Sequence, residues 1–97
     1  MKVRWSDNAT SELENIFAFI RDQSPRSAGT VARRIIDRAE SLAHFPLKGK
    51  DDKPTGMRRL AVVNYPYVIF YRINDAANEV QIVSVRHTAR KQTGAVE

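Results

Sequence analysis

The stretch that most constrains the fold is Gly56–Lys91, which has the pattern of three consecutive β-strands joined by tight turns. Runs of apolar, β-branched and aromatic residues predict strands at Met57–Val63, Tyr67–Ile73 and Val80–Arg86. Asparagine and proline punctuate the segments between them, as turns require. Because short turns connect neighbouring strands, we expect an antiparallel meander.

Two amphipathic helices are predicted ahead of the strands. Ser6 or Asp7 can cap the first helix, and Ser24-Pro25 is the start signal of the second. Apolar residues follow each start at helical spacing, first at Ala9, Leu13, Ile16, Phe17 and Ile20, and then at Ala28, Val31, Ala32, Ile35, Ile36, Ala39, Leu42 and Ala43. Phe45-Pro46 ends the second stripe. Because only a few residues separate the helices, they should form an antiparallel hairpin.

The remaining segments complete an α+β fold with the order β-α-α-β-β-β. Lys2–Trp5 alternates polar and apolar residues, as a short half-buried strand does. Residues 46–56 are rich in proline, glycine and charge, which predicts a loop. We expect residues 1–97 to form one domain with the helical hairpin packed on an antiparallel sheet. The tail from His87 to Glu97 is either a short C-terminal helix or a frayed end.

The composition excludes several classes of protein. The chain is 42% hydrophobic and 28% charged, which is ordinary for a globular protein. It has no cysteine, so a disulfide framework and a thiolate metal site are excluded. No signal-peptide pattern or membrane-spanning run is present, which predicts a cytoplasmic protein without a membrane partner. Neither a phosphate-binding glycine loop nor a metal-ligand spacing is found, so we expect no cofactor and no metal.

The positive charge is concentrated in the half of the chain that should form the sheet. The net charge is +5, and residues 48–91 hold nine lysines and arginines against four acids. This excess either solubilises the surface or forms a cationic face for an anionic partner. The partner-binding candidates are Arg58, Arg59, Arg72, Arg86, His87 and Arg90. Arg58 and Arg59 should point to opposite faces, because strand side chains alternate.

Several of these residues have a structural interpretation as well as a functional one. Arg72 could be solvated or paired with Asp75, and His87 could simply fix the tail. Neighbouring arginines favour the neutral imidazole of His87, which could then accept a proton. His44 is expected to lie at a helix end. The tyrosines of the strands could stack on bases but are better explained as packing in the sheet.

Four segments in this order resemble the RelE/ParE superfamily of toxins from bacterial type II toxin–antitoxin pairs. They are WSDNATSELENIFAFI, SLAHFPLKGK, GMRRLAVVNYPYVIFYRI and VSVRHTAR, and together they cover nearly the whole chain. The YPYVIFYR segment and the HTAR ending are more similar to the ParE branch than to the RelE branch.

The resemblance implies different activities in the two branches. ParE-like members inhibit DNA gyrase without being hydrolases, whereas RelE-like members are metal-independent ribonucleases that cut messenger RNA on the ribosome. In the RelE branch an arginine typically follows the start of the central strand, and Val68 occupies that place here. Valine cannot stabilise developing charge on a phosphate, so gyrase inhibition is favoured.

Other interpretations remain open. If the chain is a ribosome-dependent nuclease, Arg58, Arg72, His87 and Arg90 are the candidate catalytic set. A third possibility is a toxin relic that mainly serves as a regulatory partner. In each case the resemblance implies a cognate ParD-like antitoxin whose C-terminal segment wraps around the toxin. We expect that segment to be acidic or amphipathic, with carboxylates on Arg58, Arg72 or Arg90.

Overall fold

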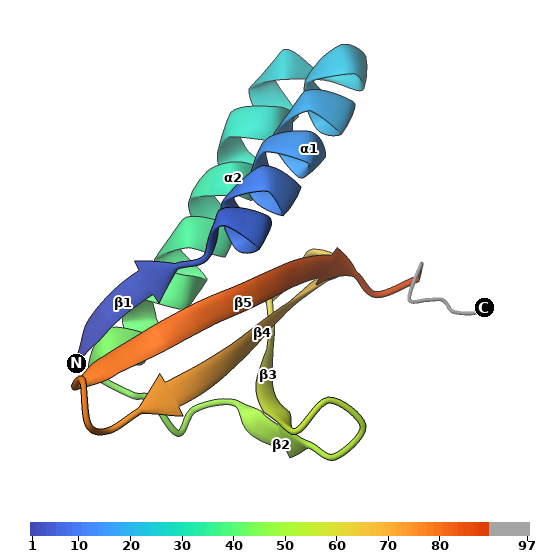
Figure 1. Cartoon of the computed structure of the whole chain (residues 1–97). Coiled ribbons are helices and arrows are strands. Elements are labelled where there is room, and N and C mark those ends of the chain that lie inside the picture. The colour runs from blue at the N-terminus through green and yellow to red at the C-terminus, as the bar shows by residue number, and fades with distance from the viewer. Residues whose placement is uncertain (90–97) are drawn as a thin grey trace.

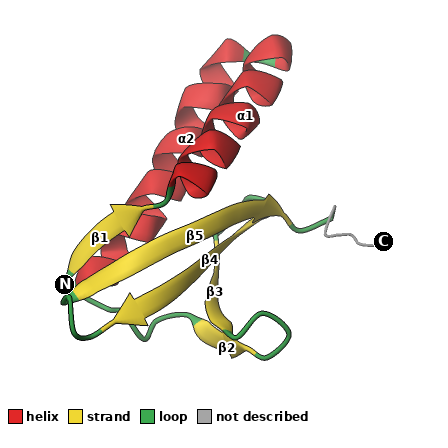
Figure 2. Ribbon diagram, viewed as in Figure 1, coloured by secondary structure: helices red, strands yellow, loops and turns green. Residues whose placement is uncertain are grey.

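The structure is a computed structural model in which residues 1–89 are described. Two helices form a hairpin that rises from one face of a five-stranded sheet (Figures 1 and 2). The elements in chain order are β1 (Lys2–Trp5), α1 (Asp7–Gln23), α2 (Pro25–Glu40), the 3₁₀ turn η1 (Ser41–Ala43), β2 (Lys50–Asp52), β3 (Met57–Ala61), β4 (Tyr67–Asn74) and β5 (Glu79–His87). The predicted α+β class and the helical hairpin on a sheet are therefore confirmed.

Serine caps start both helices. The Ser6 side chain accepts a hydrogen bond from the backbone N–H of Ala9, at 3.0 Å. Ser24 ends α1 and also caps α2, accepting from the Ser27 N–H at 3.4 Å. Only one residue lies between the helices, and the chain must therefore reverse there into an antiparallel hairpin. The apolar stripe of α2 is buried as predicted, at Ala28, Val31, Ile35 and Ala39.

The sheet has the strand order β1-β5-β4-β3-β2. The strands β3, β4 and β5 form the predicted antiparallel meander. β1 pairs with β5 in parallel, with Val3 opposite Val80, so the sheet is mixed and not wholly antiparallel as expected. The meander owes its direction to short turns, whereas most of the chain separates β1 from β5 and no turn dictates how they align.

The segment predicted as a loop contains an additional short strand, β2. Its register places Asp51 opposite Arg58, and the two side chains form an ion pair at 2.8 Å. The following turn is closed by Thr55, whose hydroxyl donates to the Asp52 carboxylate at 2.6 Å, and by Gly56 at φ 72°. The prolines, glycines and charges of this segment predict a loop. Lys50–Asp52 forms a strand only because it pairs with β3, which comes later in the chain.

The core lies between the hairpin and the helix-facing side of β4 and β5. It contains fully buried side chains from helices and strands, among them Ile35, Leu42, Ile69, Tyr71 and Ile82. The helices cover one face of the sheet, and the opposite face carries no helix within residues 1–89 (Figure 1). In this part of the chain, no helix is long and apolar enough to cross a membrane.

Candidate functional site

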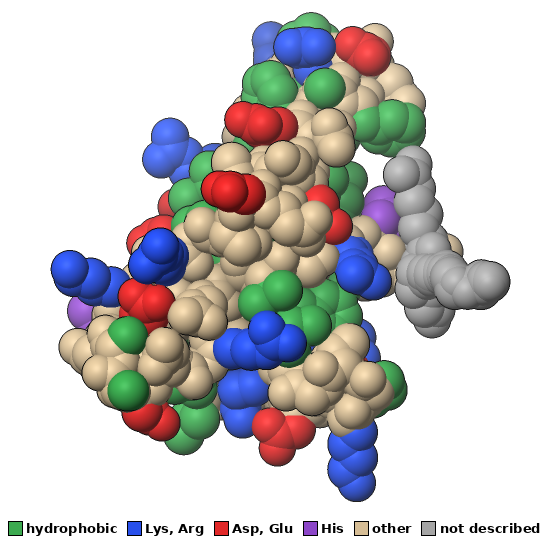
Figure 3. Space-filling view, viewed as in Figure 1, with side chains coloured by type: hydrophobic (Ala, Val, Ile, Leu, Met, Phe, Trp, Pro, Cys, Tyr) green, Lys and Arg blue, Asp and Glu red, His purple; other side chains and the backbone are tan. Residues whose placement is uncertain are grey.

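The face of the sheet away from the helices, called the open face below, gathers cationic side chains. Along β4, Ile69 and Tyr71 point into the core, so Val68, Phe70 and Arg72 lie on the open face. The register carries this face across the neighbouring strands, and its lysines and arginines are Lys2, Arg4, Lys50, Arg59, Arg72 and Arg86. All six are exposed. In Figure 3, Lys and Arg side chains lie over the sheet-bearing half with single acids between them.

The open face has a shortage of carboxylates within the described residues. Arg59 contacts Asp52 at 4.0 Å, where the Arg59 side chain is 50% exposed. Arg72 forms no ion pair within residues 1–89, so the pair with Asp75 that the sequence left open is not present. Arg4 lies across from Gln81, which also lies across from Arg72, so two arginines flank one neutral residue. Glu79 lies opposite Lys2, and Asp52 is near Arg59, so an anionic partner would meet chiefly the remaining excess of cations on this face, which includes Arg72.

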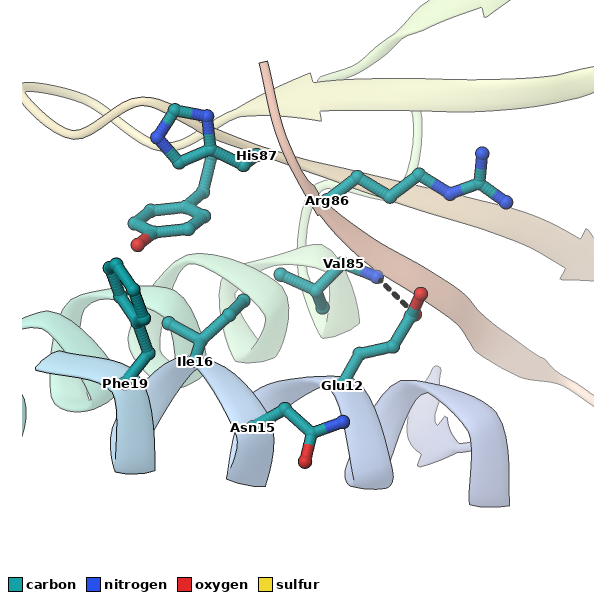
Figure 4. Close-up of a pocket in the computed structure, with 8 residues that line it drawn as sticks. Glu12, Asn15, Ile16, Phe19, Val85, Arg86 and His87 are labelled. Carbon is teal, nitrogen blue, oxygen red and sulfur yellow. Dashed lines mark hydrogen bonds between the residues drawn. The ribbon is translucent and has the colours of Figure 1, made fainter. Parts of the chain in front are cut away.

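Arg86 is held in place by a chain of hydrogen bonds that reaches α1. Its Nε donates to Ser84 Oγ at 3.0 Å, and Ser84 Oγ donates to Glu12 Oε1 at 2.8 Å. The Arg86 guanidinium lies 5.8 Å from the centre of the Phe70 ring, within cation–π range. Glu12 also accepts a hydrogen bond from the backbone N–H of Val85 at 2.9 Å (Figure 4). Val85 lies on β5 beyond Ile82, the last residue that pairs with β1.

Arg58 lies on the helix-facing side and supports the fold. Its NH2 group donates to the carbonyl oxygens of Gly49 at 2.6 Å and Leu47 at 3.2 Å. NH1 pairs with Asp51, and the Arg58 side chain is only 23% exposed. Arg59, the next residue, lies on the open face, so the predicted divergence of the two arginines is confirmed.

His87 lies at the end of β5 in a cavity of about 340 Å³ between β5 and α1. Its ring packs edge-on against Tyr67 at 5.3 Å, and its Nδ1 accepts a hydrogen bond from the Ala89 N–H at 3.1 Å. Ile16 and Phe19 of α1 form the opposite wall, while Arg86 points away from the ring (Figure 4). His87 is therefore on the helix side of the sheet.

The structure brings together some of the predicted site residues and separates others. Arg59, Arg72 and Arg86 share the open face, whereas Arg58 and His87 lie on the helix-facing side. Arg90 and the possible C-terminal helix lie outside the described residues. Within the described range, no group of three or more His, Cys, Asp and Glu side chains could hold a metal ion.

Sequence reasoning missed Lys2, Arg4, Glu12 and the cavity wall at Phe19. Lys2 and Arg4 could have been predicted, because they are the polar positions of the alternating segment Lys2–Trp5 and both are cationic. Phe19 falls outside the predicted apolar stripe of α1. A large apolar residue on the polar side of a helix indicates a surface contact, and the Phe19 side chain is indeed 50% exposed. The contact of Glu12 with the sheet gave no signal, because Ser84 and Val85 lie on β5, far away in the sequence.

Comparisons with known proteins agree on one group of toxins. The sequence profile of the family described as ParE toxin of type II toxin-antitoxin system, parDE, matches residues 3–92. Toxin RelE2 of Caulobacter vibrioides is 39% identical over 92% of this chain and 97% of its own. A candidate toxin of Sinorhizobium fredii, Y4kP, is 33% identical over 89% of this chain and 86% of its own.

Two solved structures share the fold. One is a chromosomal ParDE toxin–antitoxin system from P. aeruginosa, with a TM-score of 0.78 at 20% identity over 90% of this chain and 95% of the other. The second is the toxin–antitoxin complex RelBE2 from Mycobacterium tuberculosis, with a TM-score of 0.62 at 26% identity over 89% and 95% of the two chains.

Proposed function

This chain belongs to the ParE toxin family of type II toxin–antitoxin systems, and we propose that it arrests growth by binding and inhibiting DNA gyrase, without hydrolysing a substrate. One observation carries the proposal. The sheet separates His87, a possible proton acceptor, from Arg59, Arg72 and Arg86 on the open face. A nuclease needs its acid–base group and its phosphate-stabilising cations around one bond. The described open face can grip an anionic surface but has no histidine beside its arginines.

The position of Val68 supports the same proposal. It lies on the open face between Ala61 of β3 and Arg86 of β5, and it is only 5% exposed. An arginine at this position is what the resemblance leads one to expect in a ribonuclease of the RelE branch. Val68 shares this face with Phe70, and the Arg86 guanidinium lies over the Phe70 ring.

A supercoiling assay with the purified full-length chain and DNA gyrase tests this proposal. We expect inhibition at micromolar toxin and a loss of about tenfold in potency for the double variant Arg59→Ala/Arg72→Ala, because both cations lie on the open face. The matched control is Arg33→Ala, an exposed arginine of α2 on the other side of the molecule. Normal supercoiling together with cleavage of ribosome-bound message would overturn the proposal.

The alternative is a RelE-like, ribosome-dependent endoribonuclease. The similarity to Toxin RelE2 of Caulobacter vibrioides favours it, and so does the position of Arg86, which pairs with Val68 across β4 and β5 and therefore lies on the same face. Primer extension on translated messenger RNA after brief induction distinguishes the two targets. Discrete cuts that disappear in the Arg86→Ala variant would support the nuclease, and intact message would exclude it.

The proposal includes neutralisation by a cognate antitoxin. The two solved structures compared above are described as a toxin–antitoxin system and a toxin–antitoxin complex. The cavity beside α1 offers apolar walls at Ile16, Phe19 and Val85, while Arg72 on the open face offers a charge for a carboxylate. Arg72 pairs with Gln81 near the start of β5, whereas the cavity lies at the His87 end of that strand. An amphipathic segment that contacts both regions therefore has to run along β5.

Binding of the antitoxin tests this arrangement separately. We expect Phe19→Ala to weaken the complex at any salt concentration, because it removes apolar contact area. Arg72→Ala should reduce the slope of affinity against salt, because it removes a charge. Unchanged affinity and salt dependence for Arg72→Ala would remove this residue from the antitoxin contact.

A further inference from the structure

A second surface that none of the proposed contacts uses lies where α2 ends, on the helix side of the sheet. It includes a depression of about 250 Å³ between the last turns of α2, the segment leading to β2 and the end of β3. Five polar or charged residues and two valines line it, namely Arg34, Asp37, Arg38, Ser41, Lys48, Val62 and Val63. Three cations and one acid therefore face a small shared volume.

Two of the three cations of this depression, Arg38 and Lys48, are held by neutral groups. Arg38 Nε donates to the Ala61 carbonyl oxygen at 2.9 Å, and Lys48 Nζ donates to Ser41 Oγ at 2.9 Å. The Ser41 hydroxyl in turn donates to the Arg38 carbonyl oxygen at 2.6 Å. Within residues 1–89, neither Arg34, Arg38 nor Lys48 forms an ion pair with a carboxylate. Arg38 and Lys48 are thus oriented without an ion pair, and together with Arg34 they outnumber the single acid Asp37 of the lining, which favours binding of an anion.

Large apolar side chains border the same cations. Phe45 is 62% exposed, Leu47 is 69% exposed and Val63 is 55% exposed. Lys48 joins the two parts of the surface, because it lines the depression and its ammonium lies 5.3 Å from the centre of the Phe45 ring. A second hollow, with Phe45, Pro46, Leu47 and Lys48 in its wall, continues from there. Exposed apolar groups rimmed by charges are typical of protein–protein contacts.

We propose that this surface, the α2 patch (Arg34, Arg38, Phe45, Leu47, Lys48 and Val63), binds an acidic amphipathic peptide segment of a partner protein. Carboxylates of the segment bind Arg34, Arg38 and Lys48, and an apolar side chain packs on Phe45 and Leu47. A nucleic-acid backbone fits less well, because Asp37 lies among the cations and its phosphates gain nothing from the exposed apolar side chains.

The α2 patch and the open face can hold different partners at the same time. The open-face cations point away from the helices, whereas the patch is built from α2 and the segment that follows it. It also shares no residue with the cavity between α1 and β5. The proposal therefore does not depend on whether the target is gyrase or the ribosome.

A peptide titration of the full-length chain tests the proposal. The probe is a capped helical peptide of about 18 residues with Leu on one face and Glu on the other. The comparison probes are the same peptide with Gln in place of Glu and a short DNA duplex. Amide chemical shifts locate the contact, and calorimetry at two salt concentrations measures the affinity. We expect shifts at the α2 patch with the Glu peptide, and binding at least about tenfold weaker for the Gln peptide.

Variants connect the binding to the residues. Arg34→Glu should lower the affinity for the Glu peptide by about tenfold or more. Leu47→Ser should lower this affinity by a smaller factor, which is the same at both salt concentrations. The matched control Arg26→Glu, an exposed arginine near the start of α2 that lies outside the patch, should leave the affinity unchanged. Thermal unfolding verifies that each variant is folded. Absence of binding, equal binding of the Gln peptide, shifts confined to the open face, or preference of the patch for the DNA duplex would each overturn the proposal.

Discussion

Arg58 and Arg59 are neighbours on β3, yet they belong to two regions with opposite properties. On the helix side, Arg58 binds two carbonyl oxygens and Asp51 beside the buried hydroxyl of Tyr71. On the open face, Arg59 has one long contact with Asp52 and remains half-exposed. The comparison shows that the number of arginines in a strand does not measure a binding face. What matters is whether the protein itself already provides acceptors for the guanidinium.

The largest expected effect comes from Gly49, which closes the helix-side corner. Its N–H donates to the Tyr71 hydroxyl at 2.9 Å, and that hydroxyl donates to the Pro46 carbonyl oxygen at 2.7 Å. A Cβ at this position would lie 2.6 Å from both the Arg59 carbonyl oxygen and the Tyr71 hydroxyl. We expect Gly49→Ala to lower the free energy of unfolding by about 3 kcal/mol, measured by chemical denaturation. A loss below about 1 kcal/mol would show that the corner can relax.

The next effect compares the two arginines directly. Arg58→Ala should reduce the free energy of unfolding by about 2 kcal/mol, because the Gly49 and Leu47 carbonyl oxygens lose a charged donor. The ion pair itself contributes little of this, since Asp51 is 82% exposed. Arg59→Ala, the matched control, should change stability by less than about 0.5 kcal/mol. Equal losses for the two variants would contradict the distinction between the faces.

A smaller effect tests how α1 supports the edge of the open face. Glu12→Ala removes the acceptor of the Ser84 hydroxyl and of the Val85 N–H. We expect a loss of about 1.5 kcal/mol in unfolding free energy and faster amide exchange at Val85. Glu14→Ala, an exposed acid on the same helix, is the control and should be near neutral. Protection of Val85 that persists without Glu12 would contradict the role given to this carboxylate.

The smallest effect has the opposite sign. Gly29 lies within α2, and a Cβ there meets no atom within 4 Å. Gly29→Ala should therefore stabilise the protein by about 0.5–1 kcal/mol, because alanine loses less backbone entropy in a helix. The thermal unfolding midpoint measures this gain in stability. The same substitution at Gly49 should lower the midpoint, because a Cβ has room at Gly29 but meets closely packed atoms at Gly49. A destabilised Gly29→Ala variant would contradict this expectation.

The sequence predicted the elements well where the signal is local. Serine caps, helical apolar spacing and short turns with asparagine placed α1, α2 and the meander near their observed ends. β2 was missed, and the parallel pairing of β1 was not foreseen, because both depend on partners that are distant in the sequence. For the site, alternation separated Arg58 from Arg59 correctly, but it did not reveal that Arg58 is occupied by the carbonyl oxygens of Leu47 and Gly49.

The amino-acid sequence by itself determined the α+β class, the helical hairpin, the meander and a positive charge concentrated in the sheet half. Only the tertiary structure decided which cations remain available, because their acceptors come from other segments of the chain. Asp51 and Gly49 occupy Arg58, and Ser84 orients Arg86. The physical reason is that periodicity specifies on which face a side chain lies, whereas only packing specifies which groups that face already contains.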